Sequence, residues 1–135
     1  MSALWTNAGI DEAAQLWLGN DVYDTLTLRL FVNNHTPTVT DTAGNYTECT
    51  LAGYAAVALT PGNWSGSTSA GLATYTYPAL IFTFSAYAGG STIYGYYLQD
   101  ADGNVILADL LSPAFAVPAG GGSVAITPTY EDQKF

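Results

Sequence analysis

The clearest structural signal in the chain is the stretch TIYGYYLQDADGNVILADL, which runs from Thr92 to Leu110. Both ends of this stretch are rich in aliphatic, β-branched and aromatic residues, and Asp102-Gly103 between them is a typical two-residue hairpin turn. We therefore expect two antiparallel strands over residues 92–99 and 105–110, joined by a tight turn. Alternation along the first strand predicts two faces: Tyr94 and Tyr96 on one, Ile93 and Tyr97 on the other.

A period of two residues also marks the segments that precede this hairpin. Residues 25–32 alternate leucines and a valine on one face with Arg29 and Phe31 on the other. The segment 33–46 that follows is polar and long for a hairpin loop, which is typical of a binding loop or of a disordered segment. Residues 54–59 then form a second strand.

The most strongly β-prone region is 72–86, where Pro78 divides the pattern because proline cannot donate to a strand ladder. Beyond this proline, Leu80, Phe82 and Phe84 share one face. We expect the last strand over residues 124–129, with Val124 and Ile126 facing inward, and a polar tail over 131–135.

These segments predict an all-β fold, an antiparallel two-sheet β-sandwich of jelly-roll or immunoglobulin-like type, with seven or eight strands. A short helix precedes it, because Ile10, Ala13, Ala14 and Trp17 fall at helical spacing before Gly19. We divide the chain into a helical segment or arm (1–22) and one sandwich domain (23–135). The first is either a lid on the sandwich or an arm that reaches a neighbouring subunit.

The charge of the chain excludes one class of partner. Only 10 % of the residues are charged, and eleven acidic residues face Arg29 and Lys134, for a net charge of −9. Nucleic-acid binding requires lysine and arginine to displace counterions from phosphates, and the same holds for anionic membrane surfaces. We therefore expect no nucleic-acid and no membrane partner. We also see no secretion signal, so we expect synthesis in a cytoplasm.

No catalytic, cofactor-binding or metal-binding constellation is apparent, and we expect no enzyme. Cys49 is a lone cysteine, typical of a small buried side chain, and His35 is interpreted as a solvated loop residue. Glu48 has no identifiable partner. A hydrolase would have to depend on Glu48 or Asp109, or on a carboxylate pair such as Asp21 with Asp24.

Residues 100–104, DADGN, match the start of a calcium-binding loop, but its twelfth position is Leu111 in place of a carboxylate. The hairpin turn explains these residues better than a metal site does.

Aromatic residues are the strongest functional signal. Tyrosines are dense between residues 75 and 97, and alternation places some of them on each face of their strands. They are either core residues, interface residues or a platform on which sugars stack. Together with the apolar N-terminus they give the candidate contact residues Leu4, Trp5, Trp17, Trp64, Tyr94 and Tyr96.

The short helix followed by LRLFVNNHTPT (28–38), GYA (53–55), PALIFTF (78–84) and IYGYY (93–97) resembles small β-sandwich structural proteins of tailed bacteriophages. The resemblance implies a virion protein of the capsid cement or decoration type, located on the capsid surface. It would bind the major capsid protein and itself, as a homotrimer, and would stabilise the head. A tail or fibre module and a carbohydrate-binding sandwich that uses Trp64 and the tyrosines are the alternatives.

Overall fold

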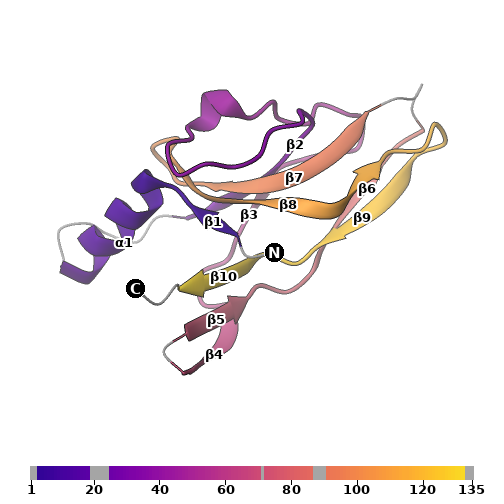
Figure 1. Ribbon diagram of the computed structural model, residues 1–135. Coiled ribbons are helices and arrows are strands. Elements are labelled where there is room, and N and C mark those ends of the chain that lie inside the picture. The colour runs from indigo at the N-terminus through magenta and orange to yellow at the C-terminus, as the bar shows by residue number, and fades with distance from the viewer. Residues whose placement is uncertain (1–2, 19–24, 71, 87–90, 133–135) are drawn as a thin grey trace.

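The computed structural model describes residues 3–18, 25–70, 72–86 and 91–132 of the chain (Figure 1). These residues form ten strands in three antiparallel sheets, one α-helix and one turn of 3-10 helix. The all-β architecture with a single short helix near the N-terminus, predicted from the sequence, is thereby confirmed.

The largest sheet is built around the hairpin that the sequence predicts. Its strand order is β1-β8-β7-β2-β3, with β1 at Leu4–Trp5, β8 at Val105–Ala116, β7 at Thr92–Gln99, β2 at Thr27–Phe31 and β3 at Val57–Ala58. The turn between β7 and β8 closes through a hydrogen bond from the Asp100 N–H to the Asn104 carbonyl. Gly103 has φ +90°, a conformation that glycine adopts without strain. We call this sheet A.

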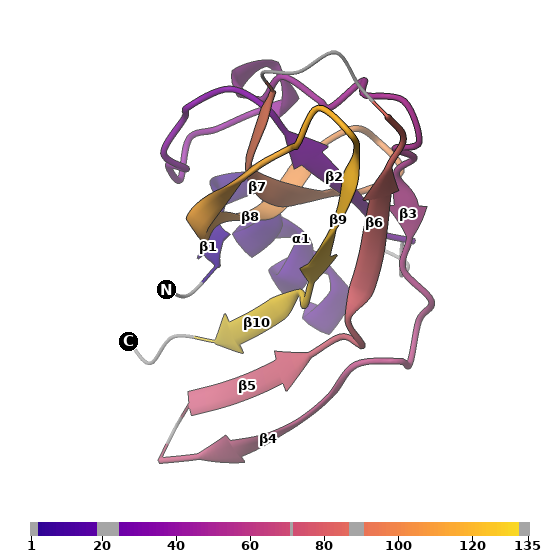
Figure 2. The same cartoon turned by 90° about the vertical axis from the view of Figure 1, so that its right-hand side faces the viewer.

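A second layer covers one face of sheet A (Figure 2). It is the two-stranded sheet C, in which β6 (Leu80–Phe84) pairs with β9 (Gly122–Ile126). The main apolar core contains residues of both sheets, because alternate residues of β6 and β9 point toward sheet A. This core includes Leu28, Leu30, Phe82, Phe84, Ile93, Leu98 and Ile126. The predicted inward faces of β6 and β9 are confirmed.

The opposite face of sheet A is covered by the segment that connects β2 to β3 (Figure 1). Its 3-10 turn, η1 (Ala43–Asn45), is followed by Tyr46, whose ring stacks on Tyr97 at 4.8 Å between centroids and meets Phe31 edge-on at 4.9 Å. Sheet A is therefore buried on both faces. The long polar segment 33–46 is an ordered cover rather than a free loop.

The predicted division of the tyrosines on β7 is wrong. Tyr96 lies in the main core together with Ile93, whereas Tyr94 packs with Tyr97 in the smaller cluster under the 33–46 segment. The pairing of β7 with β8 shifts register between Ile93 and Gly95, and a bulge of this kind changes which face a side chain points to. The one sign of this shift in the sequence is Gly95, because a glycine inside a strand often marks a bulge.

The third sheet, sheet B, projects away from the sandwich (Figures 1 and 2). Its order is β10-β5-β4, with β10 at Thr129–Asp132, β5 at Leu72–Thr76 and β4 at Ser65–Ser69. The break at Pro78 separates β5 from β6 as predicted. The sequence did not predict β4 or β10, and it overestimated the strand at 54–59, which shrinks to β3.

The N-terminal segment packs on the same domain. Strand β1 pairs with β8, and α1 (Asn7–Leu18) begins at Thr6, whose hydroxyl accepts a hydrogen bond from the Gly9 N–H and donates to the Val105 carbonyl. Gly9 lies against Ile106, where a Cβ would come within 2.1 Å of the carbonyl oxygen. Of the four residues predicted at helical spacing, Ile10 is 50 % exposed, Ala13 is half-buried, and the side chains of Ala14 and Trp17 lie outside the described part of the chain.

No helix in the described residues is long and apolar enough to cross a membrane.

Candidate functional site

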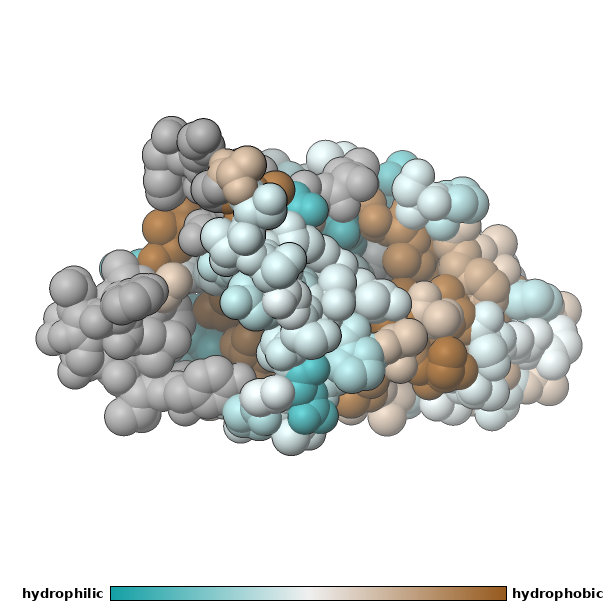
Figure 3. Space-filling view, turned by 90° about the horizontal axis from the view of Figure 1, so that it is seen from below, coloured by the Kyte–Doolittle hydropathy of each residue, from teal (hydrophilic) through white to brown (hydrophobic). Residues whose placement is uncertain are grey.

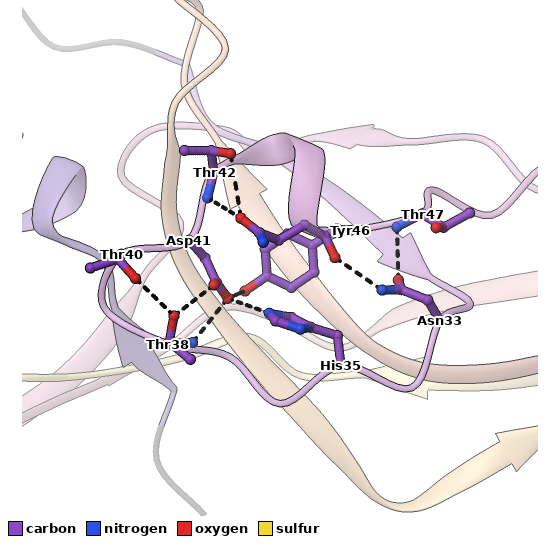
Figure 4. A network of polar contacts seen from close by, with 9 residues as sticks. Asn33, His35, Thr38, Thr40, Asp41, Thr42, Tyr46 and Thr47 are labelled. Carbon is purple, nitrogen blue, oxygen red and sulfur yellow. Dashed lines mark hydrogen bonds and ion pairs between the residues drawn. The ribbon is translucent and has the colours of Figure 1, made fainter.

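The densest cluster of polar side chains lies in the 33–46 segment, where Asp41 is the centre of a hydrogen-bond network (Figure 4). The Asp41 carboxylate accepts hydrogen bonds from the Thr38 hydroxyl at 2.7 Å and from the Thr38 N–H at 2.9 Å. It also accepts one from the Tyr46 hydroxyl at 2.7 Å, and Nε2 of His35 lies 2.7 Å from it. Four groups of one segment thus converge on a carboxylate that is almost fully buried.

This network keeps Asp41 ionised. Burial alone raises the pKa of a carboxyl group, but the hydrogen bonds from Thr38, Tyr46 and His35 outweigh it and lower the pKa of Asp41 to about 2. Burial together with the contact to Asp41 raises the pKa of the Tyr46 phenol. The network therefore fixes Tyr46, and with it the 33–46 segment, on sheet A.

The interpretation of His35 as a solvated loop residue is wrong. Its ring meets Tyr46 edge-on at 5.3 Å, and its side chain is paired with Asp41. An Asp–His pair is the orienting part of a catalytic triad, which also needs a nucleophile. The His35–Asp41 contact joins two residues of the 33–46 segment and thereby helps to hold this segment in place.

Glu48 has partners, contrary to the sequence-based expectation. Its Oε1 lies 2.8 Å from the Arg29 guanidinium and accepts a hydrogen bond from the Tyr54 hydroxyl at 2.9 Å. The Tyr54 oxygen in turn accepts the Leu30 N–H at 3.2 Å. The hydrogen bond from Arg29 to Glu48 raises the pKa of the guanidinium, although burial opposes it. This cluster joins β2 to the segment before β3 and leaves Glu48 bound as a structural carboxylate.

The other residues considered for chemistry are Cys49, Asp109, Asp21 and Asp24. Cys49 is buried in the main core, and burial raises the pKa of its thiol, which suppresses the reactive thiolate. Burial also raises the pKa of Asp109, and nearby Glu131 adds to this effect. Asp21 and Asp24 lie outside the described residues.

Within the ranges that the structure describes, no three His, Cys, Asp or Glu side chains are grouped so that they could hold a metal ion. The calcium-like stretch 100–104 is the β7–β8 turn. Its Asp100 carboxylate accepts hydrogen bonds from the backbone N–H of Asp102 at 3.0 Å and of Asn104 at 2.8 Å. This carboxylate is therefore used to form the turn.

The predicted contact residues do not form a single patch. Leu4 and Trp5 are half-buried in β1, Trp64 is half-buried and meets Tyr77 edge-on, and Tyr94 is half-buried beside the 33–46 segment. Tyr96 is only 3 % exposed, and burial raises the pKa of its phenol to about 12. Tyr96 therefore cannot offer its ring to a partner. The side chain of Trp17 lies outside the described part of the chain.

An aromatic chain connects sheet B to the sandwich. Trp5 on β1 meets Tyr130 on β10 edge-on at 5.0 Å, and Tyr130 meets Tyr75 on β5 at 6.4 Å. Edge-to-face pairs of this kind stabilise their geometry beyond the area they bury. Trp5 therefore links the first strand of the chain to the last one.

Among the described residues, four large aliphatic side chains are exposed: Ile10 on α1 (50 %), Val39 in the 33–46 segment (45 %), Leu72 on β5 (38 %) and Ile81 on β6 (66 %). The backbone at Val39 lies beside the first turn of α1, because the Asn7 N–H donates to the Val39 carbonyl at 2.7 Å. We call the part of the surface formed by these two neighbouring segments, which carry Ile10 and Val39, the Ile10–Val39 surface. Sequence reasoning missed Val39 because a single apolar residue in a polar segment gives no periodic signal.

Comparisons with known proteins add no relative, since no family model, no curated protein and no solved structure matches the chain.

Proposed function

We propose that the protein is a non-enzymatic structural component of a bacteriophage particle, a decoration protein that binds the outer surface of the head and braces it. The observation that carries this proposal is the Ile10–Val39 surface. Two aliphatic side chains are exposed there on a rigid base, because α1 is attached to β8 and the 33–46 segment is fixed by Asp41. Rigid exposed apolar area favours docking onto another protein, since little entropy is lost on binding.

The charges support a protein partner. Arg29 is bound to Glu48, so the described residues offer no unpaired lysine or arginine to a phosphate backbone. A net charge of −9 keeps free copies apart in solution and favours a partner surface that is neutral or basic.

The mechanism is thermodynamic linkage. A protein that binds the assembled shell, and not the separate subunits of the major capsid protein, stabilises the shell in proportion to its occupancy. Many weak contacts are repeated over a symmetric shell, and self-association links the bound copies. Together these contacts raise the overall affinity for the shell well above that of a single contact. The resemblance to decoration proteins of tailed phages supports the location on the capsid surface.

The proposal is tested by binding the purified chain to shells assembled from the major capsid protein of the same virus. We expect cosedimentation with shells and a higher temperature of shell disruption. Ile10→Glu and Val39→Glu should each abolish binding, because each buries a charge in the contact. The matched control is Ile81→Glu, which changes an even more exposed isoleucine on sheet C and should bind normally.

A wild-type chain that does not sediment with shells, or equal losses in all three variants, would contradict the proposal. Electron cryomicroscopy of the native particle then separates the alternatives. Density on the tail or fibre in place of the head supports the tail module. The carbohydrate-binding alternative would use the aromatic chain Trp5–Tyr130–Tyr75 as a platform on which sugars stack. Binding to a glycan array that is abolished by Tyr75→Ala would support this alternative.

A further inference from the structure

Among the described residues, sheet B has no second layer of strands or helices packed on one of its faces. Every residue of β4 is exposed, and no residue of β5 is buried. Seen from the side where sheet B projects, the surface is pale and weakly polar, between brown apolar patches (Figure 3). Sheets of two or three strands generally need a packed face for stability. In the described residues, sheet B is joined to the sandwich by the aromatic chain through Trp5 and by a hydrogen bond from the Thr129 N–H on β10 to the Tyr96 hydroxyl at 3.3 Å.

The two edges of sheet B differ in charge. Among the described strands its order is β10-β5-β4, which places β10 and β4 at the two ends of the sheet. Natural proteins protect such edges with charged residues, proline or bulges. The edge strand β10 contains Glu131 and Asp132, whereas β4 reads SGSTS and pairs with β5 in continuous register from Ser65 to Ser69. Within the described part of the chain, the β4 edge therefore has no charge, proline or register shift to protect it.

We propose that β4 pairs antiparallel with β4 of a second copy of the chain, about a two-fold axis at Ser67. The result is a continuous six-stranded sheet, β10-β5-β4 and its symmetry mate. In this register Ser67 faces its own copy, Gly66 faces Thr68, and Ser65 faces Ser69. Small hydroxyl side chains opposite one another are compatible with close pairing and with cross-strand hydrogen bonds.

A second copy is the occupant that the observations favour. An antiparallel strand edge is complementary to itself under a two-fold rotation, so no other sequence is required. Two copies that each carry −9 repel each other over most of their surface, and β4 is a segment where they can meet without opposing carboxylates. This inference rests on the proposed function only in giving it a self-association, which is a two-fold dimer in place of the homotrimer implied by the resemblance, and it needs no capsid.

The contact is small. Pairing of two five-residue strands buries much less than the roughly 1,200 Å² of a standard stable interface, so we expect a dissociation constant between about 10 µM and 1 mM. On a surface that binds many copies side by side, the effective concentration reaches the millimolar range, and such a contact is then occupied. The dimer should therefore be transient in dilute solution and persistent on an assembly.

The test introduces charged residues at position 67, where the two copies meet, and measures their effect on dimerisation. Ser67→Glu and Ser67→Lys each set two like charges against each other, so each variant alone should dimerise at least about fivefold more weakly than the wild type. An equimolar mixture of the two should recover a dimer, because each pair then brings Glu against Lys. Sedimentation velocity over a concentration series measures all of these states with the full chain.

The matched controls are Thr83→Glu and Thr83→Lys, which charge an exposed hydroxyl residue on sheet C and should leave the dimer unchanged. A second measurement does not depend on weak binding: Ser67→Cys should form a disulfide-linked dimer on mild oxidation, since antiparallel neighbours lie within bridging distance. Ser123→Cys, the control on β9, should not.

A wild-type chain that stays monomeric up to about 1 mM, with Ser67→Cys uncrosslinked, would overturn the inference. So would a mixture of the charged Ser67 variants that remains monomeric while the wild type dimerises. Ile10→Glu keeps an intact β4 edge and should dimerise normally, so failure of shell binding and failure of dimerisation are separate outcomes.

Discussion

Replacing Asp41 with asparagine removes the charge at the centre of the 33–46 network while keeping the size of the side chain. The pKa of Asp41 lies near 2 in the folded protein, against about 3.9 in an unfolded chain. That difference corresponds to about 2–3 kcal/mol of stability at pH 7. Because the folded pKa is the lower one, this contribution is complete above about pH 5 and is lost as the pH falls through 2.

The assay is urea denaturation of wild type and Asp41→Asn at pH 7 and at pH 3. We expect the variant to be less stable by about 2–3 kcal/mol at pH 7, and the difference to shrink to about half at pH 3, where Asp41 is already partly protonated in the unfolded chain. The control Asp102→Asn changes an exposed carboxylate of the β7–β8 turn and should show no such trend. A difference that stays constant between the two pH values would refute the reasoning.

Three further predictions concern the packing of the sandwich. In the same denaturation assay, Gly9→Ala should destabilise the protein by about 2 kcal/mol or more, because the added Cβ would overlap the Ile106 carbonyl. Its control is Gly120→Ala, which has open space around it and should change the stability by less than about 0.5 kcal/mol. Tyr54→Phe should cost about 1–2 kcal/mol, since the Leu30 N–H and Glu48 each lose a partner; exchange of the Leu30 amide with solvent deuterium should accelerate. Deletion of residues 1–19 should lower the melting temperature sharply, because Ala3 and Thr6 are buried on sheet A; a truncated chain that melts like the full one would show that the segment is an arm.

The parts of the fold that could be predicted are those fixed by local sequence. The β7–β8 hairpin follows from Asp102-Gly103 and its apolar flanks, and the break between β5 and β6 follows from Pro78, which cannot donate to a ladder. Strand β4 could not be predicted, because serine and glycine have low strand propensity and its pairing is supplied by β5.

The polar site was beyond sequence reasoning for a related reason. His35 and Asp41 are six residues apart in a segment without periodicity, and only the folded path of that segment brings them together. Arg29 and Glu48 lie on separate segments, and their pairing depends on the contact between Phe31 and Glu48. The register shift that buries Tyr96 depends on β8, so the sequence of β7 alone cannot determine it.

The pairing of β1 with β8 also determines the order in which the protein can fold. The hydrogen bond between Thr6 and the Val105 carbonyl joins residues 99 positions apart. During synthesis β1 therefore has no partner until most of the chain has left the ribosome, and Trp5 stays exposed for that time. Contacts this distant in sequence slow folding, because a long loop must close before they form. The first strand to be synthesised is thus among the last to pair. Until then Trp5 is accessible to chaperones, and the surface of the folded protein that would bind a partner has not yet formed.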